Sequence, residues 1–449
     1  MYIIRKATKG DVDQILRIYN NSILFLRNLG VDQWQNNYPN IDVVNNDINN
    51  DCLYVLTDDK NIIGVMAFIK DKDDTYDKIY NGNWISNGIY YTIHRISVLN
   101  KGKNIAKYLI DYAIKESIRD NVLSLRIDTH SDNFVMQKFL EKCNFKYCGE
   151  IYLKDGSLRR GYEYMINNNF NKYTNELFSS ERALYNKKEI IVDNCAFKGE
   201  EDGESALKEC ENVLVYNTLF DLRYPLWHST NIELNNINMT INCRAPIWYS
   251  KNINISDSVL KCVKGLRECS NTNIVNSSID SLEFGWKSNN INVSKSELKG
   301  EYMFLDSSVI KLDSVKFNGK YSFQYVCDLE INNCEINTKD AFWHANNVIV
   351  RDSYIKGEYL GWYSKNLKFV NCIIESTQAL CYCDSLVLEN CKLVNSDLSF
   401  EYSDVTADIE SINSSIKNPL KGSIICDKNI DIIMENSKYD SQCVIKIKD

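Results

Sequence analysis

The stretch between residues 90 and 118 joins an apolar run, a basic loop and an amphipathic run, a combination that can bind an anion. Residues 90 to 98 are β-branched and aromatic with rough alternation, which predicts a strand. The loop that follows carries Lys101 and Lys103. From Ala106 apolar residues recur at helical spacing, so the free amides of the first helical turn would point back into the loop. An anion site and a plain surface crossover both fit this segment.

The elements that must position this segment alternate between strand and helix over residues 1 to 168. Strands are expected near residues 1–7, 52–57, 62–70, 90–98, 123–129, 147–153 and 162–166. Helices are expected near residues 11–25, 40–48, 106–118 and 134–143. Thr8, with Asp11 three residues on, is a plausible N-cap for the first helix. This order predicts an α/β fold, a mixed twisted sheet with helices.

The overall composition narrows the classes of function. At 449 residues the chain is long enough for two or more domains, and its net charge of -8 argues against broad nucleic-acid affinity. The N-terminal residues lack a charged leader with an apolar core, and no run of 18 apolar residues occurs, so we expect a cytoplasmic protein without a membrane partner. The 16 cysteines lack zinc spacing and a secreted context. We expect reduced, buried cysteines that act as small apolar fillers, and no metal.

Residues 1 to 168 resemble the GNAT superfamily of N-acetyltransferases. In that family acetyl-CoA lies between two splayed strands, and its pyrophosphate binds a loop of pattern R/Q-x-x-G-x-G/A. Lys101 to Ala106 match this loop, although Lys101 replaces Arg or Gln and Asn104 replaces glycine. Asparagine tolerates a left-handed backbone better than other non-glycine residues. The resemblance implies acetyl-CoA as acetyl donor, held by these residues: Ile96, Ser97, Val98, Lys101, Gly102, Lys103, Asn104, Ile105, Ala106 and Asn133.

The resemblance leaves the catalytic residues open. The family's usual acid, a tyrosine seven residues after Asn133, is replaced by Leu140. Acetyl transfer needs amides that polarise the thioester, a base for the ammonium proton and a route to protonate the thiolate. His94 and His130 are candidate bases, Tyr91 and Tyr152 are candidate acids, and Trp34 and Tyr38 are candidate walls of the acceptor pocket. The histidines could instead be structural residues that are hydrogen-bonded in the sheet or a loop, and Trp34 and Tyr38 could simply pack on the sheet. Strand alternation would place His94, Ile96 and Val98 on one face, and Arg95 and Ser97 on the other.

Beyond about residue 188 the sequence repeats. An Asn, Asp or Lys landmark recurs every 18 to 21 residues from Asn217 to Asn390, with Asp313 among its members. Nine residues before the last nine landmarks stand Trp227, Trp248, Arg267, Trp286, Phe304, Gln324, Trp343, Trp362 and Cys381. Units this short have no helical period, and two or three short strands per unit fit one coil of a parallel β-solenoid. Asn and Asp side chains would form a ladder at a turn.

Residues 181–185, 203–205, 224–227 and 358–363 make this half resemble the DUF3737 family. The resemblance implies a right-handed, pectin-lyase-like β-helix and brings no established activity. We therefore expect a GNAT domain at 1–168, a linker with a capping helix at 169–187, and a β-helix domain at 188–449. The helix, near residues 174–185, would cover the first coil.

The repeat places aromatic residues and histidines in stripes along the solenoid. These stripes could line a groove suited to a sugar chain, or pack partly inward as structural rows. The candidate groove residues are Trp227, His228, Trp248, Tyr249, Trp286, Trp343, His344, Trp362 and Tyr363. Lyase chemistry is disfavoured, because Arg223, Arg244 and Arg267 are not joined by a convergent set of aspartates.

Three functions follow. The leading hypothesis is an acetyl-CoA-dependent N-acetyltransferase that acts on a primary amine, with the solenoid binding or presenting the acceptor, a sugar or peptide, or a partner. The second is a carbohydrate-binding or carbohydrate-active solenoid with an accessory GNAT domain. The third is a non-catalytic scaffold. Homo-oligomers are compatible with all three.

Overall fold

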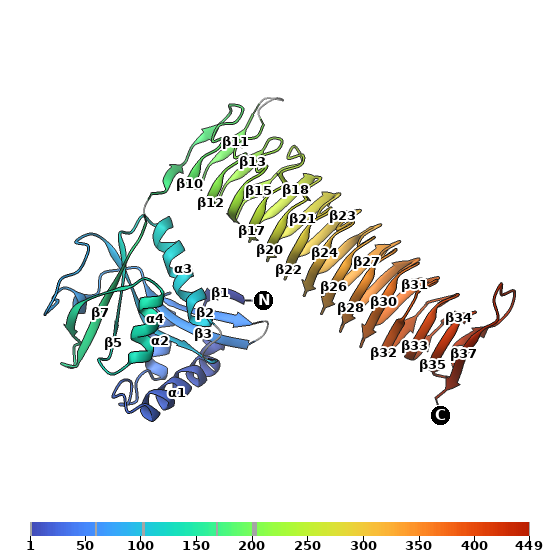
Figure 1. Ribbon diagram of the computed structural model, residues 1–449, viewed down its shortest axis with the longest axis horizontal. Helices are drawn as coiled ribbons and strands as arrows, with labels where there is room; N and C mark the ends of the chain where they lie inside the picture. Colours follow the sequence, from blue (N-terminus) through green and yellow to red (C-terminus); the bar gives the residue numbers. More distant parts are fainter. Residues whose placement is uncertain (1, 59–60, 101–103, 168, 200–203, 449) are drawn as a thin grey trace. The chain divides into compact units, whose positions relative to one another are not determined.

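The computed structural model describes residues 2–58, 61–100, 104–167, 169–199 and 204–448 (Figure 1). The chain divides into two compact units, Met1–Phe170 and Asn171–Asp449. The first is an α/β unit and the second is built from strands.

The first unit is a seven-stranded mixed sheet of order β1-β2-β3-β4-β5-β7-β6 with helices on both faces (Figure 1). Its elements are β1 (Tyr2–Lys6), η1 (Lys9–Asp11), α1 (Val12–Asn28), α2 (Ile41–Asn49), β2 (Leu53–Asp58), β3 (Asn61–Ile69), η2 (Asp74–Tyr76), β4 (Tyr90–Val98), α3 (Ile105–Arg119), β5 (Ser124–Thr129), α4 (Phe134–Lys142), β6 (Lys146–Tyr152) and β7 (Leu158–Met165). This is the order that the alternation of apolar runs predicts, so the α/β fold is confirmed.

The helices cover the sheet in two layers. Apolar residues of α1 and α2, such as Ile18 and Val44, pack on one face. Residues of α3 and α4, such as Leu109 and Leu140, pack on the other. Burial of each apolar stripe holds these helices on the sheet.

Two features distort the sheet at β4. β4 and β5 are parallel neighbours, but among the described residues their pairing ends at Ile93 and Ile127, although β4 continues to Val98. On the other side of β4, a β-bulge places two residues, Arg95 and Ile96, opposite Met66 of β3. Arg95 has a φ of 50°. Bulges of this kind redirect side chains and are frequent next to active sites.

The bulge makes the predicted alternation wrong. Ile93, Ile96 and Val98 all contact the core under α3. His94 follows Ile93 and faces the opposite side, so it does not share a face with Ile96. The extra residue in β4 shifts the alternation by one position.

The second unit is a parallel β-solenoid whose described strands follow one another coil by coil. They are β8 (Asn171–Thr174), β9 (Leu177–Phe178), β10 (Lys188–Asp193), β11 (Ala196–Lys198), β12 (Glu211–Tyr216), β13 (Leu219–Asp221), β14 (Thr230–Asn235), β15 (Asn238–Met239), β16 (Ile247–Trp248), β17 (Lys251–Ser256), β18 (Val259–Val263), β19 (Leu266–Arg267), β20 (Ser270–Val275), β21 (Ser278–Leu282), β22 (Asn289–Ser294), β23 (Glu297–Glu301), β24 (Ser308–Asp313), β25 (Lys316–Lys320), β26 (Cys327–Asn332), β27 (Glu335–Lys339), β28 (Asn346–Arg351), β29 (Tyr354–Glu358), β30 (Lys365–Val370), β31 (Ile373–Thr377), β32 (Leu386–Val394), β33 (Asp404–Ile412), β34 (Ser415–Lys417), β35 (Lys421–Cys426), β36 (Asp431–Ile433) and β37 (Gln442–Ile447).

The polar landmark of the repeat is a left-handed turn between two strands. Asn371, for example, has a φ of 52°, and its Nδ2 donates to Asp352 Oδ1 at 3.0 Å while its Oδ1 accepts from Asn390 Nδ2 at 2.9 Å. Asparagine suits the site because it tolerates the left-handed region and bonds the coils on both sides. The predicted ladder is therefore present.

One unit departs from the predicted register by a single residue. The left-handed turn there falls on Ser314 rather than Asp313, and Leu305 rather than Phe304 continues the tryptophan row. Phe304 instead stacks in the core on Phe323, with ring centroids 5.5 Å apart. The sequence pattern selects Asp313 there because this polar residue ends β24, directly before the turn residue Ser314.

The capping helix expected near residues 174–185 is wrong. Asn171–Thr174 and Leu177–Phe178 are strands that pair with the next coil. Phe178 stacks on Phe197 at 4.8 Å, and Phe197 on Phe220 at 5.0 Å. Joining this aromatic stack overrides the weak local helix preference, so the segment is a coil of the solenoid.

Many of the cysteines do more than fill space. All 16 are free, and one buried row shows their role. The Ser250 amide donates to Cys269 Sγ at 3.4 Å, and the Cys269 amide donates to Ser288 Oγ at 3.1 Å. The Ser288 amide donates in turn to Ser307 Oγ at 2.9 Å. Cysteine therefore stands in for serine in a ladder that satisfies turn amides inside the core, where an unpaired amide is costly.

Candidate active site

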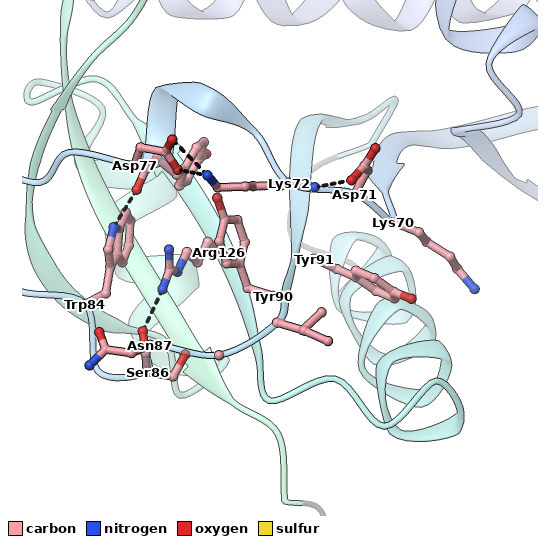
Figure 2. Close-up of a pocket in the computed structure, with 13 residues that line it drawn as sticks. Lys70, Asp71, Lys72, Asp77, Trp84, Ser86, Asn87, Tyr90, Tyr91 and Arg126 are labelled. Carbon is pink, nitrogen blue, oxygen red and sulfur yellow. Dashed lines mark hydrogen bonds and ion pairs between the residues drawn. The ribbon is translucent and has the colours of Figure 1, made fainter.

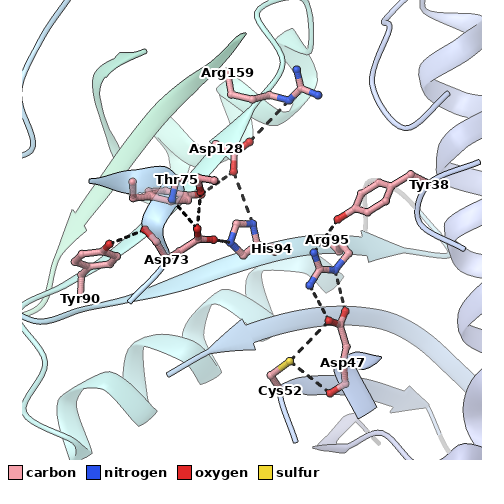
Figure 3. Close-up of polar contacts among 11 residues, drawn as sticks. Tyr38, Asp47, Cys52, Asp73, Thr75, Tyr90, His94, Arg95, Asp128 and Arg159 are labelled. Carbon is pink, nitrogen blue, oxygen red and sulfur yellow. Dashed lines mark hydrogen bonds and ion pairs between the residues drawn. The ribbon is translucent and has the colours of Figure 1, made fainter. Parts of the chain in front are cut away.

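His94 lies between two carboxylates on the face of β4 opposite α3 (Figure 3). Its Nε2 is 2.9 Å from Asp73 Oδ2, and its Nδ1 is 3.7 Å from Asp128 Oδ1. A carboxylate only accepts, so Nε2 donates its proton to Asp73. Nδ1 lies beyond hydrogen-bond range of Asp128 and is left free to accept a proton.

Both carboxylates are held by further bonds. Asp73 accepts from the amide and hydroxyl of Thr75 at 2.9 and 2.6 Å. Burial alone would raise the pKa of Asp73, but the hydrogen bonds from His94 and Thr75 outweigh it and hold this pKa well below its usual range. Asp128 Oδ1 accepts from the buried Tyr76 hydroxyl at 2.6 Å. The two carboxylates are thus fixed in place around the imidazole.

The β-bulge ties the segment after α1 to the sheet. Arg95 donates two bonds to Asp47 of α2, both at 2.9 Å, and Nη1 donates to Tyr38 Oη at 2.8 Å (Figure 3). Ser97 bonds Ser22 of α1 at 2.5 Å. Tyr38 is therefore hydrogen-bonded to the residue that follows His94 in the chain.

The amino end of α4 joins the same segment. Asn133 caps α4 by accepting from the Met136 amide at 3.1 Å, and its Nδ2 donates to Gln33 at 2.9 Å. Trp34, next in the chain, has a φ of 65° and packs edge-on against Tyr19 at 5.9 Å. His130 Nδ1 accepts from the Asp132 amide at 3.2 Å, which gives it a role in the turn before α4.

The predicted anion loop is only partly described. Lys101, Gly102 and Lys103 lie outside the described residues. Asn104 is the N-cap of α3 with φ 56° and ψ 14°, so it adopts the left-handed backbone that the family's glycine would adopt. Ile105 and Ala106 form the first turn of α3.

Neither candidate acid lies beside His94. The Tyr91 hydroxyl points to Asp120 at 3.2 Å, near the carboxyl end of α3. Burial and the Asp120 carboxylate raise the pKa of Tyr91, which makes it a weaker acid. Tyr152 is 50% exposed and packs edge-on against Tyr80.

A cavity of about 520 Å³ lies beside this network and shares Tyr76 and Tyr90 with it (Figure 2). Arg126 reaches into it between Trp84 and Tyr90, with its guanidinium 4.3 and 3.8 Å from the two ring centroids. The guanidinium donates to Ser86 O at 2.7 Å and to Glu163 at 3.2 Å. Its cation is therefore already paired, which favours a structural role.

The tryptophans of the solenoid stack on one another. Trp227 lies parallel to Trp248 at 5.3 Å, and Trp343 lies parallel to Trp362 at 5.6 Å. The indoles donate to backbone carbonyls of the next coil, as Trp343 does to Tyr359 O at 2.6 Å. Trp286 bonds Tyr302 O in the same way. A sugar ring needs a free aromatic face, and stacking covers one face of each of the rings Trp227, Trp248, Trp343 and Trp362.

A second row lies beside the tryptophans and is open to solvent. Tyr325 stacks on His344 at 4.9 Å, and His344 stacks on Tyr363 at 5.5 Å. Tyr325 and Tyr363 are 52% and 47% exposed. Nearer the start of the solenoid, His228 stacks on Tyr249 at 4.8 Å. This row presents ring edges and hydroxyl groups rather than ring faces.

Across the described part of the chain, three or more His, Cys, Asp or Glu side chains do not converge as metal ligands. Among the described helices, none is long and apolar enough to cross a membrane.

Comparison with known proteins identifies both units. Residues 23–145 match the acetyltransferase (GNAT) family, so the first unit contains an acyltransferase domain. Residues 171–447 match DUF3737, a family described as proteins of unknown function, and this match spans more than half of the chain. The protein therefore belongs to the DUF3737 family, with a GNAT domain preceding the solenoid.

Solved structures are similar to a little more than a third of the chain. A GNAT acetyltransferase from Streptococcus agalactiae is 31% identical, with 36% of this chain and 95% of that chain covered and a TM-score of 0.34. An N-acetyltransferase from Staphylococcus aureus is 22% identical, with coverages of 37% and 99% and a TM-score of 0.29. YncA from Salmonella typhimurium, solved with its cofactor acetyl-CoA, is 16% identical, with coverages of 37% and 94% and a TM-score of 0.29. None of the curated proteins matches.

Sequence reasoning missed the partners of His94. Asp73 lies in a loop without a motif, and Asp128 lies on β5, two residues before His130. A dense run of acidic residues, Asp71 to Asp77, was the available signal. It could not show which carboxylate turns toward the histidine.

Proposed function

We propose that this protein transfers an acetyl group from acetyl-CoA to a primary amine. The observation that carries the proposal is the separation of β4 from β5 after Ile93 and Ile127, beside the bulge at Arg95. Two strands that part in this way leave room for a ligand between them, and backbone amides beyond the last pair are free to polarise a carbonyl. The GNAT match over residues 23–145 supports this interpretation.

The residues present fit acetyl-CoA. Thr129, the last residue of β5, is 1% exposed, and its hydroxyl has no hydrogen-bond partner among the described residues. A buried hydroxyl without a partner is expected where a bound ligand would supply one. Ile96, Ser97, Val98 and Asn133 would line the donor site, and the first amides of α3 at Asn104, Ile105 and Ala106 would bind the pyrophosphate. The bound group would supply a thioester whose C–S bond breaks as the N–C bond of the amide forms, and the departing thiolate would take up the second proton that the amine nitrogen loses.

His94 is the base in this proposal. An amine is nucleophilic only after it loses a proton, and His94 Nδ1 can accept that proton. The carboxylate of Asp128, 3.7 Å away, would stabilise the resulting imidazolium, and Asp73 holds the ring in the correct tautomer through Nε2. Trp34 and Tyr38 would bound the acceptor side.

The solenoid is proposed to bind the acceptor or a partner protein through its exposed row of tyrosines and histidines, His228, Tyr249, Tyr325, His344 and Tyr363. Tyrosine suits such contacts because it offers a large rigid surface with a hydroxyl for hydrogen bonding. The stacked faces of Trp227, Trp248, Trp343 and Trp362 make a sugar-stacking groove a weaker proposal.

A thermal-shift titration of the full chain with acetyl-CoA tests donor binding. Because a ligand that binds only the folded state stabilises it, the melting temperature of the first unit is expected to rise with acetyl-CoA concentration. A melting temperature that stays constant at millimolar acetyl-CoA would favour the non-catalytic scaffold instead.

A further inference from the structure

We propose that Arg159 binds a carboxylate of the acceptor, so that the substrate is an α-amino acid or the amino end of a related zwitterion. This inference rests on the proposed function and on His94 as the base. Arg159 lies on β7, which pairs with β5. Asp128 of β5 is opposite Gly161, two residues from Arg159. It had no place among the residues singled out in the sequence.

Arg159 is a buried cation without a full set of partners. The residue is 8% exposed, yet Nη1 donates only to the neighbouring Leu158 O at 3.0 Å. Its nearest carboxylate, Asp128 Oδ2, is 3.9 Å from Nε, which is too far for a hydrogen bond. In the described chain, no further bond of its guanidinium is present. Within that part of the chain, none of its nitrogens is both fully buried and without a partner, so the unbonded N–H groups retain contact with solvent and are accessible to a substrate carboxylate.

Two other arginines of the first unit show the contrast. Arg5 makes a bidentate pair with Asp11 at 2.7 and 2.8 Å, and Arg95 makes one with Asp47 at 2.9 and 2.9 Å. The fork of a guanidinium matches a carboxylate in this way. Arg159 has the fork, but its ion-pair partner Asp128 lies 3.9 Å from Nε and does not form a bidentate pair, so a substrate carboxylate could take that place.

The position of Asp128 sets the spacing between the two ends of the substrate. Its carboxylate lies between His94 and Arg159, one oxygen facing each of them (Figure 3). An ammonium group beside His94 Nδ1 would also meet Asp128, while a carboxylate a few bonds away would reach Arg159. In an α-amino acid a single carbon separates the amine from the carboxylate. This short separation suits His94 and Arg159, which lie on either side of the Asp128 side chain.

The test compares amino acids with their decarboxylated amines in a thiol-release assay with acetyl-CoA. The pairs are leucine with isopentylamine, phenylalanine with phenethylamine, lysine with cadaverine, and glutamate with γ-aminobutyrate. For at least one pair we expect kcat/KM to favour the amino acid by tenfold or more. Arg159→Gln is expected to reduce that preference at least tenfold, mainly through KM, and Arg159→Lys to retain part of it, since the charge remains without the fork.

Arg160→Gln is the matched control, because Arg160 lies next in the chain but stacks on Tyr147 at 4.2 Å. It should leave the preference unchanged, and thermal melts of all three variants verify folding. Equal turnover of amine and amino acid by the unaltered protein would overturn the role of Arg159 while leaving acetyl transfer intact. So would a preference that survives in a folded Arg159→Gln protein. If no amine of any pair is acetylated, the proposed function fails and this inference fails with it.

Discussion

His94 Nε2 lies 2.9 Å from Asp73 Oδ2, so the imidazole is fixed by a residue 21 positions earlier in the chain. The bond assigns the proton to Nε2 and leaves Nδ1 facing Asp128. It gives the β3–β4 loop a chemical role, since this loop carries the residue that orients the histidine.

Replacing His94 tests its role as base. His94→Gln is expected to lower kcat by about a hundredfold to ten-thousandfold, the usual contribution of a positioned base. The shift in melting temperature with acetyl-CoA should persist, because His94 does not line the donor site in this proposal.

His130→Gln discriminates between the two candidate histidines. His130 accepts a bond from the Asp132 amide in a turn, so its replacement should change kcat by less than about threefold, far below the loss of a base. A large loss with His130→Gln and none with His94→Gln would reverse the assignment.

Asp11 is expected to make the first unit sensitive to acid. The hydrogen bonds from Arg5, the largest cause, and from Thr8 lower the pKa of Asp11 from 3.8 to about 2, although burial opposes them. A lowered pKa in the folded state means that the stabilisation is complete above about pH 4 and is lost as the pH falls toward 2.

Asp11→Asn keeps an acceptor for the Thr8 amide but removes the ion pair with Arg5, and should therefore destabilise the unit at pH 7 by about 1 kcal/mol. The difference between the two proteins should shrink as the pH falls from 4 toward 2. Urea melts at several pH values would show it, and a difference independent of pH would contradict the role assigned to the carboxylate.

The buried cysteine ladder predicts a specific order of stabilities. Cys269 Sγ accepts the Ser250 amide at 3.4 Å and donates to Ile247 O at 3.3 Å. Cys269→Ser keeps both bonds and should be nearly neutral. Cys269→Ala leaves a buried amide without an acceptor and should cost about 1 to 3 kcal/mol.

Denaturant midpoints of the solenoid, followed by tryptophan fluorescence, would measure these changes. Cys327→Ser serves as the control, because Cys327 is exposed. Equal effects of Ser and Ala at position 269 would show that the cysteine is only a filler.

The left-handed turns predict an order of stabilities among variants of their turn residue. At Asn371, with a φ of 52°, glycine keeps the backbone conformation but loses the ladder, whereas alanine loses the ladder and strains the backbone. We expect the protein to be most stable with asparagine, less stable with Asn371→Gly and least stable with Asn371→Ala, the last two differing by about 1 kcal/mol. Denaturant midpoints would rank them, and an alanine variant as stable as the glycine variant would contradict this explanation.

The fold could be predicted from the sequence because its signals are periodic. The order of apolar runs up to residue 168 gave the elements of the first unit, and the recurring Asn and Trp gave the coils of the second. The predicted helix near residues 174–185 failed because Phe178 joins an aromatic stack with Phe197, a contact between coils that local sequence does not encode.

The candidate site was harder to predict than the fold. His94 was singled out as a candidate base and Tyr38 as a candidate pocket wall, and these roles stay predictions, whereas strict alternation hid the bulge at Arg95 that lies between them. Asp73, Asp128 and Arg159 come from a loop and two different strands, so only the folded chain brings them to the histidine. The cysteines are free and mostly buried, as expected, but the sequence could not show that those in the serine rows bond to the neighbouring coil.

Amine acetylation by the full chain is the most direct test of the proposed function. Thiol release from acetyl-CoA, measured over amino acids, simple amines, amino sugars and peptides, should show turnover of at least one acceptor, with mass spectrometry detecting one N-acetyl product per thiol. A panel without turnover, from protein whose melting temperature still rises with acetyl-CoA, would contradict the proposal and leave a domain that binds the donor without using it.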